Sequence, residues 1–179
     1  LSRRTVQKVL AELFHVPCAL GTLQNRLEDT SEALKPVCEE LEDALLQHSV
    51  LNIDETSYPH NGKLQWLWAF VTESFAYLTI QHSRGSKVLK NVLGAKFDGV
   101  IVCDRFSAYV KYHKDRACGL IQFCWAHILR DIKALPCVMA RGSRELFSRL
   151  VRRRVGAVFR LWHVLKRGGM SRAEFIERA

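Results

Sequence analysis

The chain has 179 residues, of which 48% are apolar and 25% are charged, and its net charge is +9. This length allows one sizeable core with an appendage and is too short for two large domains. The six cysteines have no repeating spacing, and no apolar run approaches the roughly 20 residues that span a bilayer. A disulfide scaffold and a membrane-spanning protein are thereby excluded. We expect a soluble intracellular protein whose true start lies upstream, because the first residue is not Met.

Residues 1–48 are predicted to form a helical segment that resembles a helix-turn-helix. Apolar side chains recur at helical spacing over residues 6–14 and again over residues 20–27. Val16-Pro17 falls between the two stretches, and the residue before a proline is disfavoured in a helix. A third helix is predicted to begin near Pro36 and to end at about Gln47.

The second of these helices carries polar side chains that could read DNA. Gln24, Asn25 and Arg26 face away from its apolar stripe and belong to residue types that hydrogen-bond to base edges. The following residues, 28–43, are acidic and oppose contact with DNA. We therefore treat Gln24, Asn25 and Arg26 as possible DNA-binding residues, with an ordinary helix pair as the alternative.

From residue 50 onward the pattern changes to short apolar strands alternating with helices. The predicted order is strand, strand, strand, helix, strand, helix, strand, helix, over residues 50–53, 66–72, 75–81, 86–93, 100–103, 108–112, 120–124 and 125–135. The first three strands form a meander, and the fourth is expected to lie parallel beside the first. This is the order of an RNase H-like α/β fold with a mixed sheet, in which the meander is followed by βαβα. We expect this core over residues 49–140.

Residues 141–179 are predicted to form a basic helical segment. They contain 11 Lys and Arg against 3 Asp and Glu, whereas residues 1–140 contain 16 against 15. Such a segment suits a polyanion such as DNA, because neutralising phosphates releases counterions. Arg152, Arg153 and Arg154 are the possible DNA-binding residues here, and a solvated helix face is the alternative.

Two aspartates follow apolar strands at matching positions. Asp54 and Asp104 each come after four strand residues, and the two strands are predicted to be parallel neighbours. Their carboxylates should therefore emerge at the same edge of the sheet, where two hard oxygen ligands suit Mg²⁺. Two metal ions about 3.5–4 Å apart can activate an attacking oxygen and stabilise a leaving one in phosphoryl transfer. A lone Asp at a strand end is usually a turn former, so the matching pair favours metal binding.

Other residues near this edge offer weaker candidates. Glu55 is a second choice as a ligand, but strand alternation points it away from the side that Asp54 faces. Asp131 is a possible stand-in for a third acid, but a surface partner of nearby Arg130 or Lys133 is the favoured interpretation. Cys124 and His127 have a spacing that invites a zinc site or a Cys-His nucleophile, yet neither four ligands nor an orienting acid can be named. His127 at the start of a helix could instead contact a phosphate.

Several stretches together resemble the insertion-sequence-66 transposases. They are residues 50–56 (VLNIDET), residues 99–109 (GVIVCDRFSAY), Cys124-Trp125-Ala126-His127 and Arg130. The upstream residues 3–26 are similar to the helical segment that precedes that family's catalytic domain, and the resemblance covers roughly residues 1–140. The Asp-Glu-Thr motif alone is weak, and its combination with the other stretches at these spacings is specific.

The resemblance implies a DDE transposase of a bacterial cytoplasm that binds Mg²⁺ or Mn²⁺ and acts on transposon-end and target DNA. Asp54 would match the first catalytic acid and Asp104 the second, with His127 and Arg130 as possible phosphate contacts. The full-length protein would be a homo-oligomer. The family's third acid has no counterpart in this chain, so we expect a fragment that is inactive alone, with residues 141–179 beginning an insertion. The alternatives are a non-catalytic DNA-binding remnant and another RNase H-like nuclease.

Overall fold

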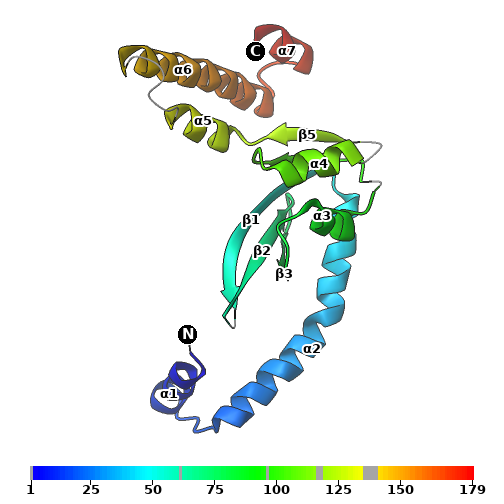
Figure 1. The fold of residues 1–179 in the computed structure, drawn as a ribbon, viewed down its shortest axis with the longest axis vertical. Helices are drawn as coiled ribbons and strands as arrows, with labels where there is room; N and C mark the ends of the chain where they lie inside the picture. Colours follow the sequence, from blue (N-terminus) through cyan, green and yellow to red (C-terminus); the bar gives the residue numbers. More distant parts are fainter. Residues whose placement is uncertain (1, 61, 96, 116–118, 135–140) are drawn as a thin grey trace. The chain divides into compact units, whose positions relative to one another are not determined.

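A five-stranded mixed sheet organises the first part of the chain (Figure 1). The computed structural model describes residues 2–60, 62–95, 97–115, 119–134 and 141–179. The chain separates into two compact units, Leu1–Gln122 and Phe123–Ala179. The helices and strands are, in chain order, α1 (Arg3–Leu13), α2 (Leu20–Ala44), the 3₁₀ turn η1 (Leu45–Gln47), β1 (Val50–His60), β2 (Lys63–Val71), β3 (Ala76–Gln81), α3 (Ser86–Leu93), β4 (Val100–Cys103), α4 (Ser107–Asp115), β5 (Leu120–Phe123), α5 (Trp125–Lys133), α6 (Arg141–Lys166) and α7 (Arg172–Arg178).

The sheet has the strand order β3-β2-β1-β4-β5. β1, β2 and β3 form an antiparallel meander, and β4 lies parallel to β1 on the other side. The chain passes from β3 to β4 through α3 and from β4 to β5 through α4, as expected for strands that need crossover helices. The predicted RNase H-like α/β order is therefore confirmed.

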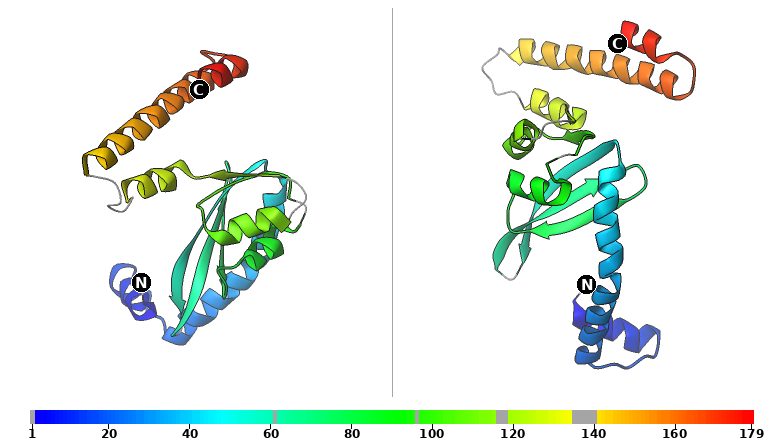
Figure 2. Two further views of the ribbon diagram at one scale, coloured as in Figure 1. Left: turned by 45° about the horizontal axis from the view of Figure 1, so that its top comes forward. Right: turned by 90° about the vertical axis from the view of Figure 1, so that its right-hand side faces the viewer.

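Alternating side chains give the sheet a buried face and an open face. Along β1, Leu51, Ile53 and Glu55 are buried, whereas Asn52 and Asp54 are exposed. Figure 2 shows α3 and α4 over the same face of the sheet. The core on that face combines strand residues with the apolar sides of α3 and α4; it contains Leu45, Leu51, Ile53, Trp68, Phe70, Val88, Leu89, Val92, Leu93, Phe97, Ile101, Cys103, Tyr109 and Tyr112. Asp54 consequently lies on the open face.

β1 is much longer than the strand predicted from the sequence. It pairs with β2 from Asn52, opposite Val71, to His60, opposite Lys63. The prediction of a strand limited to residues 50–53, with Asp54 directly after it, is therefore wrong. Antiparallel pairing with β2 supplies backbone hydrogen bonds to polar residues whose composition alone favours a turn.

The N-terminal helices also differ from the prediction in one respect. Ser2 caps α1 by accepting a hydrogen bond from the Thr5 backbone over 3.1 Å, and the predicted break after α1 is confirmed. The predicted third helix from Pro36 is wrong, because α2 continues through Pro36 as one helix. A proline inside a helix removes one backbone hydrogen bond. The Leu, Ala, Lys and Glu residues around it are strong helix formers that favour continuation.

The second unit consists of α5, α6 and α7. Trp125 at the start of α5 makes an edge-to-face contact with Phe159 of α6, with ring centroids 6.4 Å apart. Trp162 of α6 makes a similar contact with Phe175 of α7 at 6.0 Å. Two predictions involve residues 135–140, which lie outside the described residues. They are the end of the helix 125–135 and the boundary between residues 140 and 141. Among the helices that are described, none is long and apolar enough to cross a membrane.

Candidate functional site

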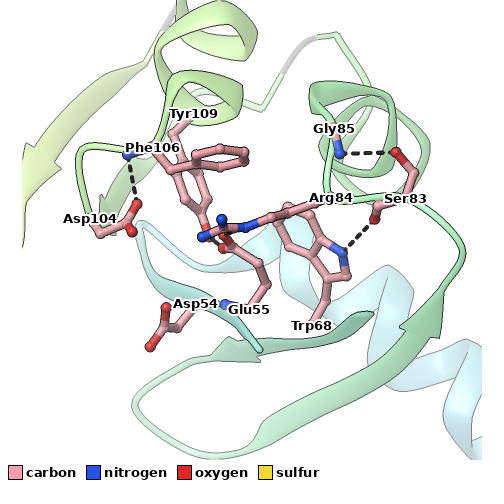
Figure 3. Close-up of polar contacts among 9 residues, drawn as sticks. All are labelled: Asp54, Glu55, Trp68, Ser83, Arg84, Gly85, Asp104, Phe106 and Tyr109. Carbon is pink, nitrogen blue, oxygen red and sulfur yellow. Dashed lines mark hydrogen bonds and ion pairs between the residues drawn. The ribbon is translucent and has the colours of Figure 1, made fainter. Parts of the chain in front are cut away.

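Asp54 lies within β1, and Asp104 directly follows β4, the strand that is parallel to β1. β1 and β4 pair from Val50 with Val100 to Asn52 with Val102, and the same register continued brings Asp54 level with Asp104. Neighbouring strands are about 4.8 Å apart. Asp54 is exposed on β1 and Asp104 is half-buried just beyond the end of β4. In the view of Figure 3, Asp54 and Asp104 both lie to the left of the Glu55 side chain.

The backbone orients one oxygen of each aspartate. Oδ1 of Asp54 accepts a hydrogen bond from the backbone N–H of Glu55 over 3.1 Å. Oδ1 of Asp104 accepts one from the backbone N–H of Phe106 over 2.8 Å, which is the Asx turn that leads into α4. Within the described residues, the other oxygen of each carboxylate has no hydrogen-bond partner. Each acid thus keeps an oxygen available to a cation.

The donor set fits a hard divalent cation. Mg²⁺ takes one or two carboxylates and keeps several waters, so two aspartates are a sufficient protein contribution. In the parts of the chain that the structure describes, no group of three or more His, Cys, Asp and Glu side chains is placed to hold a metal ion. Asp54 and Asp104 are therefore the two candidate carboxylate ligands at this edge of the sheet.

Glu55 points away from Asp54, as the strand alternation predicted. Its side chain is 0% exposed on the opposite face of β1. The Nε of Arg84, in the loop before α3, donates a hydrogen bond to Oε1 of Glu55 over 2.8 Å. The hydroxyl of Tyr109 on α4 donates a hydrogen bond to Oε2 (Figure 3). Both oxygens of Glu55 are therefore occupied by protein groups.

The environment of this buried carboxyl is electrostatically unusual. Burial raises the pKa of Glu55, hydrogen bonds from Tyr109 and Arg84 oppose the rise, and the nearby charge of Asp104 adds to it. The result is a pKa above the ordinary value. Burial, followed by the hydrogen bond to Glu55, also raises the pKa of Tyr109, so this phenol stays protonated and remains a donor.

Arg84 is held between two aromatic rings. Its guanidinium carbon lies 3.9 Å from the ring centroid of Phe106 and 4.8 Å from that of Trp66. Trp68 donates a hydrogen bond from Nε1 to the carbonyl of Ser83 over 3.1 Å, which fixes the residue before Arg84. Sequence reasoning missed Arg84 and Tyr109, because they lie 29 and 54 residues from Glu55 and no local pattern connects them.

His127 and Arg130 lie on α5 in the second unit. Arg130 is exposed and His127 is half-buried. Cys124 is the N-cap of α5. Burial raises the pKa of the Cys124 thiol, but hydrogen bonds involving His127 and the Ala126 backbone outweigh it, and the pKa is lowered. The Cys-x-x-His spacing therefore corresponds to hydrogen bonds between Cys124 and His127 within the first turn of α5.

Two of the three predicted DNA-reading residues of α2 bind side chains of their own helix. The side-chain amide of Gln24 donates a hydrogen bond to Glu28. Arg26 pairs with Asp29 over 3.1 Å, with both side chains well exposed. Asn25 is exposed. Contact of the two bonded residues with bases would require these weak surface interactions to be exchanged for contacts with DNA.

A cationic groove lies between α5 and α6. Its volume is about 650 Å³ and its lining residues are Ile132, Lys133, Glu145, Ser148, Arg149, Arg152 and Arg153. Arg154 lines a neighbouring hollow on α6 with Arg153 and Arg160. The groove brings Arg152 and Arg153 together with Lys133 and Arg149, two cations that the sequence analysis did not single out. Four cations against one Glu145 make it suitable for an anionic ligand.

Comparison with known proteins gives one family. The model of the family described as Transposase IS66 family matches residues 3–174. No curated protein matches the sequence. A solved structure with some similarity is the cryoEM structure of a simian T-cell lymphotropic virus intasome in complex with PP2A regulatory subunit B56 gamma, with 15% identity and a TM-score of 0.34. The match covers 73% of this chain and 45% of that one, so this chain spans less than half of its length.

Proposed function

Because the chain belongs to the IS66 family of transposases, we propose that it carries the first two acids of a DDE transposase site. The reaction is metal-dependent cleavage of DNA at transposon ends and transfer of the cut strand to target DNA. Asp54 and Asp104 are the proposed catalytic metal ligands. The observation that carries this proposal is the parallel β1–β4 register, whose continuation by two residues beyond Asn52 and Val102 leads to Asp54 and Asp104.

The proposed cofactor is Mg²⁺ or Mn²⁺, which when bound would activate the attacking oxygen and stabilise the leaving oxygen of the phosphodiester. The contribution of this chain is to orient the ligands. Backbone N–H groups of Glu55 and Phe106 hold one oxygen of each aspartate, and the other oxygen is left for the cation. No residue of the chain matches the family's third acid. We therefore expect residues 1–179 alone to have little or no strand-transfer activity.

The proposed partners are transposon-end and target DNA, bound by a homo-oligomeric full-length protein. The cationic groove between α5 and α6 supports phosphate contact by Arg152 and Arg153, and the adjoining hollow supports the same role for Arg154. His127 and Arg130 are further proposed phosphate contacts, and Gln24, Asn25 and Arg26 are proposed base contacts. The functional division into residues 1–48, 49–140 and 141–179 also remains a proposal.

The test uses a longer transposase that contains residues 1–179 and also supplies the third catalytic acid of the family. Cleavage of labelled donor-end DNA is measured with Mg²⁺, and scrambled-end DNA of the same length serves as the control. We expect Asp54→Asn and Asp104→Asn each to abolish end-specific cleavage. Equal cleavage of both DNAs would favour a plain RNase H-like nuclease. Full activity of either variant would exclude the proposed metal ligands.

A second candidate function is DNA binding without catalysis, which the groove between α5 and α6 favours. It predicts that residues 1–179 bind DNA in a salt-sensitive way without Mg²⁺. Binding should survive Asp54→Asn and Asp104→Asn. Electrophoretic mobility shift at several salt concentrations measures it. If the same chain also shows no metal binding at Asp54 and Asp104, this candidate replaces the transposase proposal.

A further inference from the structure

A series of contacts through Glu55, Arg84 and Phe106 connects Asp54 with Asp104. The carboxylate of Asp54 receives the N–H of Glu55, and the carboxylate of Glu55 receives the Nε of Arg84. The guanidinium of Arg84 lies on the ring of Phe106, with 3.9 Å between its carbon and the ring centroid. The N–H of Phe106 in turn donates to the carboxylate of Asp104. Figure 3 shows these residues together.

Tyr109 closes this arrangement from α4. Its hydroxyl donates to the second oxygen of Glu55, and its ring makes an edge-to-face contact with Trp68 at a centroid distance of 6.0 Å. Tyr109 is 1% exposed and the side chain of Glu55 is 0% exposed. A buried carboxylate that loses one donor has no water to replace it, so it must move or accept an unpaired oxygen.

We propose that Glu55, held by Arg84 and Tyr109, is a positioning residue that sets Asp54 and Asp104 at the separation required to share a divalent cation. This inference rests on the proposed metal site. Glu55 does not touch the cation, because both of its oxygens are bound on the opposite face of β1. It acts through its own backbone N–H on Asp54, and through Arg84 and Phe106 on Asp104.

The physical basis is the distance tolerance of a shared cation. Mg²⁺ requires ligand oxygens at about 2.0–2.1 Å in near-octahedral geometry, so small displacements of one carboxylate lower its affinity. Asp54 lies on β1, whereas Asp104 lies in the segment between β4 and α4. The described β1–β4 pairing stops at Asn52 and Val102, two residues before the acids. Beyond the end of this backbone pairing, the contacts of Glu55 with Arg84, and of Arg84 with Phe106, connect the two segments that carry the acids.

The experiment compares two tyrosines of the same helix. Tyr109→Phe removes the hydroxyl that binds Glu55, and Tyr112→Phe removes one that donates to the carbonyl of Gly94 over 2.7 Å. Both residues are 1% exposed, so each variant removes the hydroxyl of a buried tyrosine, and only Tyr109→Phe affects Glu55. The 179-residue chain is labelled with ¹⁵N and titrated with Mn²⁺. Paramagnetic broadening of the Glu55 and Phe106 amide resonances gives the midpoint.

We expect Tyr109→Phe to raise the Mn²⁺ midpoint severalfold, up to about tenfold, which is the lower end of the effect of removing a direct partner of a metal ligand, because Tyr109 acts one contact further away through Glu55. Tyr112→Phe should lower the unfolding temperature while leaving the midpoint unchanged. Glu55→Gln, which keeps the size of the side chain, should raise the midpoint as Tyr109→Phe does. Equal midpoints for Tyr109→Phe and Tyr112→Phe would overturn the positioning role.

Asp54→Asn and Asp104→Asn distinguish this failure from failure of the proposed function. If either variant keeps the broadening of the wild-type chain, the metal site itself is wrong. If both abolish the broadening and Tyr109→Phe matches Tyr112→Phe, the metal site stands and only the positioning role of Glu55 is wrong. The amide spectrum of each variant shows directly whether it is folded.

Discussion

Arg84 and Glu55 form an ion pair in which the arginine alone has access to solvent. The Nε–Oε1 distance is 2.8 Å, and the side chains are 36% and 0% exposed. The carboxylate of Glu55 therefore depends on protein groups for all of its solvation. Pairs of this kind are sensitive to removal of one partner, because the remaining charge cannot reach water.

Arg84→Ala should lower the free energy of unfolding by about 2–3 kcal/mol, less than a fully buried pair would lose because Arg84 is partly exposed. Arg26→Ala is the matched control, since Arg26 and Asp29 form an ion pair with side chains 76% and 62% exposed. Its effect should stay within about 0.5 kcal/mol. Urea unfolding followed by circular dichroism measures both, and equal losses would contradict the role of burial.

Asp54→Asn and Asp104→Asn should leave the free energy of unfolding, measured without metal, within about 0.5 kcal/mol of the wild-type value. In both variants the side-chain carbonyl can still accept the backbone hydrogen bond made by Glu55 or Phe106. Thermal unfolding in a chelating buffer measures this. Adding Mg²⁺ should then raise the unfolding temperature of the wild-type chain and of neither variant. A large loss of stability without metal would indicate a structural role for the acids.

The stability of the fold should fall between pH 10 and pH 12 through Tyr77. Burial and the hydrogen bond to Glu42, 2.5 Å long, raise the pKa of Tyr77 from 10.0 to about 12. In this window the folded state keeps a proton that the unfolded state has released, so the free energy of unfolding decreases as pH rises. Below pH 10 Tyr77 is protonated in both states, so the free energy of unfolding no longer depends on pH through this residue.

Tyr77→Phe tests this pH dependence, because phenylalanine has no proton to lose. Urea unfolding at pH 9, 10, 11 and 12 should give a shallower decline for the variant than for the wild-type chain. The other tyrosines are common to both proteins, so the difference between the two curves belongs to Tyr77. Parallel curves would mean that the pKa of Tyr77 is not raised in the folded chain.

Replacing Arg149, Arg152 and Arg153 together by Ala should weaken DNA binding equally for all sequences. Each lost phosphate contact reduces the slope of log K against log salt concentration by about 0.9, so the slope should fall by about 2–3. The control replaces Arg167, Arg172 and Arg178, which lie outside the groove, by Ala. Both triple variants therefore lose three positive charges. Fluorescence anisotropy from 50 to 300 mM salt measures both. Identical slopes would show that total charge, and not the groove, determines binding.

Local patterns were sufficient to predict much of the fold. The apolar run before Asp104 coincides with β4, and the helix closed by Gly94 is α3. The basic segment 141–179 is helical as predicted, with α6 and α7, and Ser171 caps α7 by accepting a hydrogen bond from the Glu174 backbone N–H. These features depend on residues within a few positions of one another. The parallel placement of β1 and β4 also followed, because a crossover helix leaves few arrangements for the next strand.

The sequence by itself determined the apolar runs that precede Asp54 and Asp104. It also determined on which face of its strand Glu55 lies, because side chains alternate along any strand. The tertiary structure alone decided that β1 runs on to His60, since pairing with β2 supplies the hydrogen bonds of its second half. It also decided that Arg84 and Tyr109 hold Glu55 beside the two aspartates. Those contacts join residues 29 and 54 positions apart, and a local pattern contains no information about partners at that distance.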